Sequence, residues 1–242
     1  MGLIRYLKSR ALNWTLPLPF DCRHQEYSTI SSVDDDPSRP SKRLVDISLK
    51  AIQQAREVDL SWVAKRMPVG PYWPEIWPGE HYKLLAGLML VHKPKRVVEI
   101  GTLAGWGALS MKGSLPPGSE LITIDLIPWP EIKDSALRPS DFEDGKLRQV
   151  LGDLSDPAFF ASFVETMSGC DLLFVDAPKN VVFERALLKH LSTIRLPTEA
   201  LVIFDDIRNW NMLKIWREIS KPKLDLTSFG HWTGTGIIDW NG

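Results

Sequence analysis

Apolar residues recur along the chain in two patterns, one typical of helices and the other of buried strands. Apolar positions three or four residues apart predict a helix that begins at Ser41, a residue suited to an N-cap, and continues to about residue 63. A second helix is predicted over about 79–91. Prolines and tryptophans crowd the segment 68–78 between them, which excludes a regular helix or a central strand there.

From residue 96 onward, short apolar runs alternate with helical patterns. The runs predict strands at 96–100, 121–125, 147–151, 172–175, 201–204, 224–229 and 236–240. Helices are predicted between them, up to about residue 111 and at 157–167, 183–191 and 211–219. Short apolar strands separated by helices indicate a mostly parallel α/β sheet covered on both faces. Ligands bind such sheets at the carboxyl ends of the strands, so the residues after each strand are the candidates for chemistry.

The first forty residues have a different pattern and are predicted to be an N-terminal arm and linker, with the folded domain over 41–242. Basic and apolar residues are interspersed over 4–12, which suits a short segment lying on an anionic membrane. Packing of the arm on the domain or on a second subunit is the favoured interpretation. Serines, prolines and aspartates over 28–40 indicate a flexible connection.

Composition narrows the class of protein. Lys and Arg number 29 and Asp and Glu 30, so the chain lacks the basic excess typical of nucleic-acid binding. No apolar run reaches the ~18 residues of a membrane-spanning helix. Cys22 and Cys170 are the only cysteines, which excludes a disulfide framework and a four-cysteine zinc site. We therefore expect a cytoplasmic protein that binds no nucleic acid, with a homo-oligomer left open.

The first three strand ends suggest a nucleotide-like ligand. Glycines follow the first strand with the spacing G-x-x-x-G-x-G over 101–107, which differs from the dinucleotide fingerprint G-x-G-x-x-G and counts against a nicotinamide enzyme. Asp125 ends the second strand, 24 residues after Gly101, where a carboxylate can accept both hydroxyls of a ribose. Gly152 and Asp153 follow the third strand, near the expected adenine edge. A glycine turn alone is explained by the tight turn between a strand and a helix. Three successive strand ends that carry glycines, an Asp and a Gly-Asp pair favour a bound ligand.

The next two strand ends carry acids. Asp176 follows the fourth strand, and Asp205 and Asp206 end the fifth. Three carboxylates on adjacent strand ends repel one another unless a cation or a proton lies between them. Oxygen ligands suit a hard divalent cation, Mg²⁺ before Zn²⁺. Structural roles are the alternatives for two residues near these strand ends. Asp206 would then be a helix N-cap, and Lys179 a solvated lysine at a helix start.

Residues 97–109 resemble motif I of class I S-adenosylmethionine-dependent methyltransferases, and most of all the metal-dependent small-molecule O-methyltransferases. Residues 77–85 look like the segment that precedes motif I in those enzymes, and 122–125 like the strand whose acid holds the cofactor ribose. The resemblance covers roughly 41–242. It implies a seven-stranded, mostly parallel Rossmann-like methyltransferase sheet with helices on both faces and an N-terminal helical extension.

The resemblance also implies a cofactor and a metal site. S-adenosylmethionine would contact Glu99, Gly101, Thr102, Gly105, Asp125, Asp153 and Asp176. Of these, Glu99, Gly101 and Gly105 would line its methionine end and Asp153 its adenine. Mg²⁺ or another hard divalent cation would bind Asp176, Asp205 and Asp206. The catechol-type enzymes have an Asp-Asn pair where this chain has Asp205-Asp206. The acidic pair is more similar to the macrocin and cephalosporin-modifying branch and counts against a catechol acceptor.

The implied activity is metal-assisted O-methylation of a small hydroxylated molecule, a natural product or a glycan. Lys179 would be the base, provided that cation charge and burial depress its pKa. The alternatives are a cephalosporin-hydroxylase-like enzyme on the same fold and a non-catalytic cofactor-binding scaffold. His81 and His231 lack zinc-site spacing. Either could line the acceptor pocket, but a packed or surface position is the favoured interpretation for each. The aromatic segment 68–78 either walls an acceptor pocket or covers the sheet.

Overall fold

A computed structural model describes residues 38–68, 70, 73–77, 81–209 and 211–242. Residues 1–37 of the arm and linker predicted over 1–40 lie outside the described residues, and with them the predicted contact with a membrane, the domain or a second subunit. So do residues 78–80, a part of the segment expected before the glycine turn. None of the described helices has the length and apolar character needed to cross a membrane.

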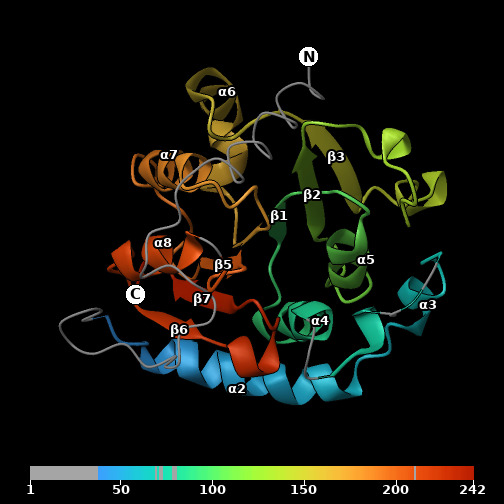
Figure 1. Cartoon of the computed structure of the whole chain (residues 1–242), viewed down its shortest axis with the longest axis horizontal. Helices are drawn as coiled ribbons and strands as arrows, with labels where there is room; N and C mark the ends of the chain where they lie inside the picture. Colours follow the sequence, from blue (N-terminus) through green and yellow to red (C-terminus); the bar gives the residue numbers. More distant parts are fainter. Residues whose placement is uncertain (1–37, 69, 71–72, 78–80, 210) are drawn as a thin grey trace.

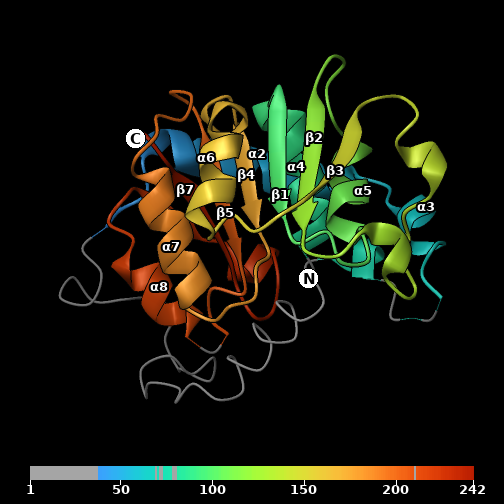
Figure 2. The ribbon, with the colours of Figure 1, turned by 90° about the horizontal axis from the view of Figure 1, so that it is seen from above.

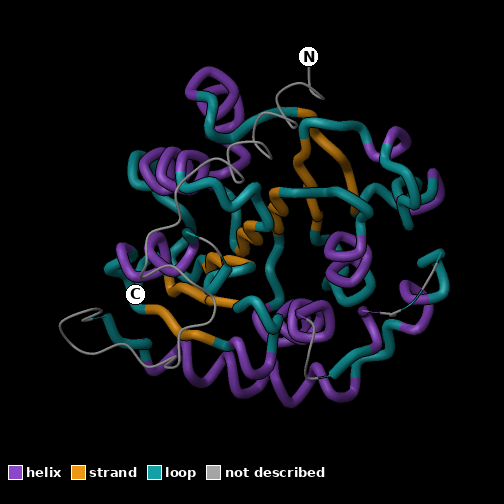
Figure 3. The backbone as a smooth tube through the Cα atoms, in the orientation of Figure 1, coloured by secondary structure: helices purple, strands orange, loops and turns teal. Residues whose placement is uncertain are grey.

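Seven strands form one sheet in the order β3-β2-β1-β4-β5-β7-β6 (Figure 1, Figure 3). Their bounds are β1 Arg96–Ile100, β2 Glu120–Asp125, β3 Leu147–Leu151, β4 Leu172–Val175, β5 Leu201–Asp205, β6 Lys223–Asp225 and β7 Thr235–Asp239. Neighbouring strands from β3 to β5 pair in parallel, whereas β7 pairs antiparallel with both β5 and β6. The predicted α/β class and mostly parallel seven-stranded sheet are confirmed.

Helices cover both faces of the sheet, as Figure 2 shows from above. One face carries α6 (Pro157–Ser168), α7 (Val182–Leu191) and α8 (Met212–Glu218), and the other carries α2 (Lys42–Glu57), α3 (Ser61–Ala64), α4 (His81–His92) and α5 (Trp106–Lys112). Successive strand residues point to opposite faces, so Val98 packs with the first group and Val97 with the second. Both sides of the strands are therefore buried, which explains their continuous apolar runs.

Local hydrogen bonds set several element ends. Ser41 caps α2, since its Oγ accepts from the Leu44 N–H at 3.1 Å, as predicted. The single helix expected over 41–63 is divided into α2 and α3, and Asp59 Oδ1 accepts the Ser61 N–H in between at 2.8 Å. The strand predicted over 224–229 ends at Asp225, because that carboxylate accepts from Thr227 and turns the chain into a 3-10 helix, η5 (Thr227–Phe229).

Ser41 also joins the first described helix to the last strand. Its Oγ donates to Asp239 Oδ2 at 2.7 Å, and the Arg43 guanidinium donates to both oxygens of the same carboxylate, at 3.3 Å and 2.7 Å. Asp239 is buried, and the pKa of its carboxyl is lowered: burial opposes this, but the hydrogen bonds from Arg43 and Ser41 outweigh it. The beginning of α2 is thus held against β7, beside the edge of the sheet.

Candidate functional site

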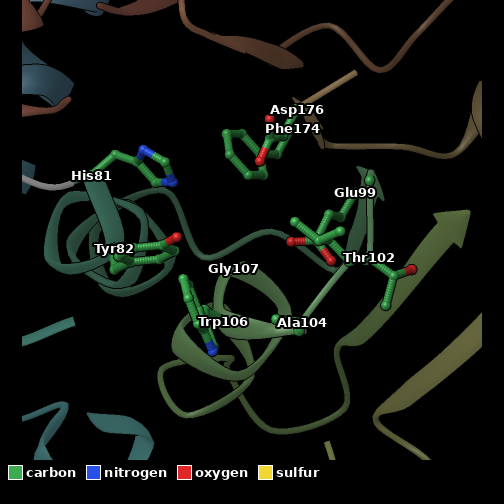
Figure 4. Close-up of a pocket in the computed structure, with 12 residues that line it drawn as sticks. His81, Tyr82, Glu99, Thr102, Ala104, Trp106, Gly107, Phe174 and Asp176 are labelled. Carbon is green, nitrogen blue, oxygen red and sulfur yellow. The ribbon is translucent and has the colours of Figure 1, made fainter. Parts of the chain in front are cut away.

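The order of the strands reverses at β1: β2 and β3 follow on one side of it, and β4 and β5 on the other. The strands β1 and β4 are therefore neighbours in space although β2 and β3 lie between them in sequence. A pocket lies at the carboxyl end of these strands, where ligands bind α/β sheets. It is lined by the turn 101–107, by Glu99 of β1, by Phe174 and Asp176 at the end of β4, and by His81 and Tyr82 at the start of α4 (Figure 4).

Gly101 is required by the backbone and not only by a ligand. Its φ is +103°, and a Cβ there would lie 2.3 Å from the Asp176 carbonyl oxygen. The Asp176 N–H donates to the Ile100 carbonyl at 2.9 Å, so the turn after β1 lies directly against the end of β4. Gly105 has a φ of +81°, and the Leu137 side chain fills the space a Cβ would take. Both glycines line the pocket, and their contact with the methionine end of a cofactor stays a prediction.

Glu99 is a buried carboxyl group that borders this pocket. Its side chain is 1% exposed, and Oε2 accepts from the Thr123 hydroxyl at 2.5 Å, while the Thr102 hydroxyl lies 2.7 Å from that of Thr123. Burial raises the pKa of Glu99 to about 8, against the hydrogen bond from Thr123, and the charges of Asp176 and Asp125 raise it further. The site therefore holds a carboxyl that ionises readily only when a cation approaches it.

Asp125 and Asp153 already accept hydrogen bonds from the chain and are not among the residues that line the pocket. Asp125 Oδ2 accepts from Leu103 N–H at 2.9 Å, and its Oδ1 accepts from the N–H groups of the two residues that follow it. Asp153 Oδ1 accepts from the N–H and hydroxyl of Ser155. Each carboxylate oxygen can accept more than one hydrogen bond, so ribose and adenine contacts remain predictions for these two residues.

The three predicted metal ligands do converge. Oxygen atoms of Asp176, Asp205 and Asp206 lie within 4.8 Å of one another, because β4 and β5 are adjacent and end together. Lys179 lies among them: its ammonium contacts Asp176 Oδ1 and lies 2.9 Å from Asp206 Oδ2 and 3.9 Å from Asp205 Oδ2. Asp206 does not cap α8, whose N-cap is Asn211. The structural alternatives for Asp206 and Lys179 are therefore both wrong.

The charge state of Lys179 differs from the one that a base needs. Burial alone would lower the pKa of its ammonium, but the carboxylates of Asp176, Asp206 and Asp205 outweigh burial and raise the pKa above its ordinary value. Lys179 is therefore a cation in this arrangement. The depressed pKa expected from the sequence would require the carboxylates to be neutralised by something else.

Two histidines belong to the same cluster, although the sequence favoured packed or surface positions for them and gave no link to Asp205. His81 Nδ1 lies 3.4 Å and His231 Nδ1 3.3 Å from Asp205 Oδ1, and the two rings meet edge to face with centroids 5.2 Å apart. The pKa of Asp205 is well below its ordinary value: burial opposes this, but the nearby His81, His231 and Lys179 outweigh it. The histidines are 150 residues apart, so spacing carries no signal, and only the position of His81 before the glycine turn hints at its place.

The strand order with a single antiparallel strand, β7, together with the glycine turn after β1, defines the fold of class I S-adenosylmethionine-dependent methyltransferases. The fold implied by the resemblance of residues 97–109 is thereby confirmed. No family model matches the chain, and no curated protein matches it.

Several solved structures are similar to the chain. A methyltransferase from Podospora anserina, PaMTH1, bound to S-adenosylhomocysteine, is 18% identical, with a TM-score of 0.49 over 81% of this chain and 88% of that one. A methyltransferase from Geobacter sulfurreducens is 17% identical, with a TM-score of 0.49 over 80% and 87%. The O-methyltransferase TomG of Streptomyces achromogenes, involved in tomaymycin synthesis and bound to S-adenosylmethionine, is 18% identical, with a TM-score of 0.46 over 81% and 90%. Their ligands and acceptors are properties of those proteins.

Proposed function

We propose that this protein is an S-adenosylmethionine-dependent O-methyltransferase that acts on a hydroxyl group of a small molecule, a natural product or a glycan. The observation that carries the proposal is the buried carboxyl of Glu99, which borders a pocket made by the glycine turn 101–107. The methionine end of the cofactor carries an ammonium group. That cation would compensate the charge of Glu99, whose pKa of about 8 reflects the lack of compensation in the chain itself.

Asp176 connects this pocket to the acceptor side of the proposed site. It lines the pocket and also contacts the Lys179 ammonium. An acceptor hydroxyl held among Lys179, Asp205 and Asp206 would therefore lie next to a cofactor bound along the glycine turn. Methyl transfer is an in-line displacement that gains most of its rate from such positioning.

Aromatic side chains suit a flat or sugar-like acceptor, and several come from segments that adjoin His81 and His231 in the sequence. The rings of Trp77 and Phe229 lie 6.5 Å apart, and Trp232, which is 68% exposed, follows His231 with its ring 5.8 Å from that imidazole. These residues would form an apolar rim beside the charged cluster. They support the interpretation of the aromatic segment as a wall of the acceptor pocket.

The carboxylates of Asp176, Asp205 and Asp206 fit a hard divalent cation in number, charge and convergence. When bound there, Mg²⁺ would anchor the acceptor oxygen and lower its pKa. Lys179 would have to turn away from Asp176 and Asp206, and burial would then lower its own pKa toward the value a base needs. While the carboxylates hold it, Lys179 can only donate hydrogen bonds to the acceptor.

One observation favours a metal-independent variant of the same reaction: the Lys179 ammonium already lies where a cation would neutralise the carboxylates. Treatment with EDTA, followed by Mg²⁺, separates the two. We expect EDTA to suppress methyl transfer and Mg²⁺ to restore it, with the affinity for S-adenosylhomocysteine changed little. Asp205→Asn should weaken Mg²⁺ binding without unfolding the chain. The matched control is Asp144→Asn, because Asp144 has an exposed side chain that pairs with Lys112. Full activity in EDTA would show that methyl transfer does not require a metal ion.

Cofactor binding is the test of the proposal as a whole. Isothermal titration with S-adenosylhomocysteine should give saturable binding. Gly101→Val should abolish it, since any side chain at this φ of +103° meets the backbone of Asp176. Gly118→Val is the matched control, because Gly118 also has a positive φ but lies in open space. Binding of NADH in place of S-adenosylhomocysteine would overturn the proposal. Cofactor binding without methyl transfer to any hydroxylated acceptor would instead indicate a non-catalytic cofactor-binding scaffold.

A further inference from the structure

The second oxygen of Asp205 faces two imidazoles. Oδ2 is the oxygen nearest Lys179, at 3.9 Å, whereas Oδ1 lies 3.4 Å from His81 Nδ1 and 3.3 Å from His231 Nδ1. The three side chains come from the start of α4, the end of β5 and the loop before β7. The fold therefore brings two nitrogen donors to the oxygen of Asp205 that does not face Lys179, and His231 Nδ1 also lies 3.4 Å from Asp206 Oδ1.

His81 and Asp205 have buried polar atoms that make no hydrogen bond within the described part of the chain. His81 is 3% exposed, and neither of its ring nitrogens, nor Asp205 Oδ1, has a hydrogen-bond partner among the described residues. Buried polar groups are normally hydrogen-bonded. By contrast, His92 Nε2 and His190 Nδ1 each meet a backbone carbonyl oxygen, at 3.1 Å and 3.0 Å. A cation beside His81 would engage its Nδ1 and Asp205 Oδ1 together.

The spacing of these atoms fits a shared metal ion. Nitrogen and oxygen ligands lie about 2.0–2.2 Å from Zn²⁺, and a tetrahedral arrangement places such ligands about 3.3–3.5 Å from one another. The observed separations from Asp205 Oδ1, 3.4 Å to His81 and 3.3 Å to His231, match that arrangement, and all three ligand atoms lie within 4.8 Å of one another.

We infer that His81, Asp205 and His231 bind a divalent transition metal ion, of the Zn²⁺ or Fe²⁺ kind, in preference to Mg²⁺. Imidazole ligands suit these ions, whereas Mg²⁺ prefers oxygen ligands alone. The inference goes beyond the proposed function, because metal binding here requires neither the cofactor nor methyl transfer. Lys179 can keep its contacts with Asp176 and Asp206 when this set is filled, whereas Mg²⁺ among the three carboxylates would displace it.

Thr233 shows how the site can accept the ion. Its hydroxyl donates to Asp206 Oδ1 and lies 2.7 Å from His231 Nδ1. When His231 Nδ1 turns to a metal, Thr233 retains its hydrogen bond to Asp206, so that no new buried polar group is left without a partner. Two of the three ligands, His81 and Asp205, are already fixed by burial, and His231 is the adjustable one, with a side chain 17% exposed.

Cobalt(II) tests this site in the full-length protein, because its visible absorption reports the number and type of ligands. Metal-stripped protein should bind one equivalent of Co²⁺ that excess Mg²⁺ does not displace. His81→Ala and His231→Gln should each weaken Co²⁺ binding at least ~10-fold, the loss seen when even an indirect metal partner is removed. His190→Ala and His92→Ala are the matched controls, since these imidazoles meet backbone carbonyl oxygens, and they should leave the affinity unchanged. The melting temperature establishes that each variant is folded.

Unchanged Co²⁺ affinity in folded His81→Ala or His231→Gln protein would overturn the inference. Displacement of Co²⁺ by Mg²⁺ would also overturn it and would assign the ion to Asp176, Asp205 and Asp206. Should His81→Ala fail to fold, His231→Gln and a rise in the melting temperature of the wild-type protein with Zn²⁺ decide the matter. Absence of S-adenosylhomocysteine binding in protein that binds Co²⁺ contradicts the proposed function and leaves this inference standing.

Discussion

The buried carboxyl of Glu99 makes the stability of the protein depend on pH in a way that one substitution should remove. Its pKa is raised from 4.5 to about 8 in the folded chain, first because it is buried. Between these values the folded chain keeps a proton that the unfolded chain releases. Folding stability contributed by this group is therefore fully present below pH 4.5 and is lost as the pH rises through 8.

The size of the effect follows from the pKa. Each pKa unit corresponds to about 1.4 kcal/mol, so the rise from 4.5 to about 8 amounts to about 5 kcal/mol lost above pH 8. Glu99→Gln keeps the shape of the side chain and an oxygen that can accept from Thr123 at the same position. Because glutamine does not ionise, the variant should match the wild type within about 1 kcal/mol at pH 5 and exceed it by up to about 5 kcal/mol at pH 8.5.

Urea unfolding at pH 5 and pH 8.5 measures this difference, because the titration of all other groups cancels between the two proteins. Glu165→Gln, at an exposed position of α6, controls for the substitution itself. Equal differences between wild type and Glu99→Gln at the two pH values, or a variant less stable at pH 8.5, would refute the reasoning. The same variant should bind S-adenosylhomocysteine more weakly, since it cannot pair with an ammonium group.

Two further predictions concern buried charges. Asp239→Asn should lower the free energy of unfolding by about 1–3 kcal/mol in urea, since it weakens the hydrogen bonds from Ser41 and Arg43; because the pKa of Asp239 is lowered, the wild-type advantage should vanish as the pH falls through that pKa. Lys179→Met should raise the affinity for Mg²⁺ in calorimetry, because the ammonium no longer competes for the carboxylates, and it should lower turnover. The control is Lys189→Met, at an exposed position. Unchanged Mg²⁺ affinity in Lys179→Met, or an equal rise in Lys189→Met, would contradict this prediction.

The strands could be predicted because burial on both faces of the sheet requires continuous runs of apolar residues. The bounds of β1, β3 and β4 coincide with the apolar runs at 96–100, 147–151 and 172–175. The same signal failed at 224–229, where apolar residues continue past the end of β6. There the Asp225 carboxylate accepts two hydrogen bonds from Thr227 and ends the strand. A side-chain contact of this kind has no periodicity for a sequence pattern to detect.

The site was predictable only as far as it follows from strand ends. Asp176 and Asp205 converge because parallel neighbours end at the same edge of a sheet, a rule that needs no side-chain detail. The place of Lys179 among the carboxylates depends on the local backbone, since its φ is +57°. His81 and His231 reach Asp205 through a helix start and a loop, neither of which the sequence ties to β5.

The formal charges of the cluster indicate why a divalent cation is expected at it, whichever donors hold that ion. Asp176, Asp205 and Asp206 carry three negative charges, and the Lys179 ammonium supplies one positive charge. With neutral imidazoles, which is the form that binds metals, the chain's own compensation leaves two negative charges in a mostly buried site. Unpaired buried charge is costly. A divalent ion bound to the imidazoles and Asp205 brings the net charge of the cluster to zero while Lys179 stays in place. An ion bound among the three carboxylates would instead displace Lys179. Removal of Lys179 should therefore change the metal affinity only if the ion lies among the carboxylates.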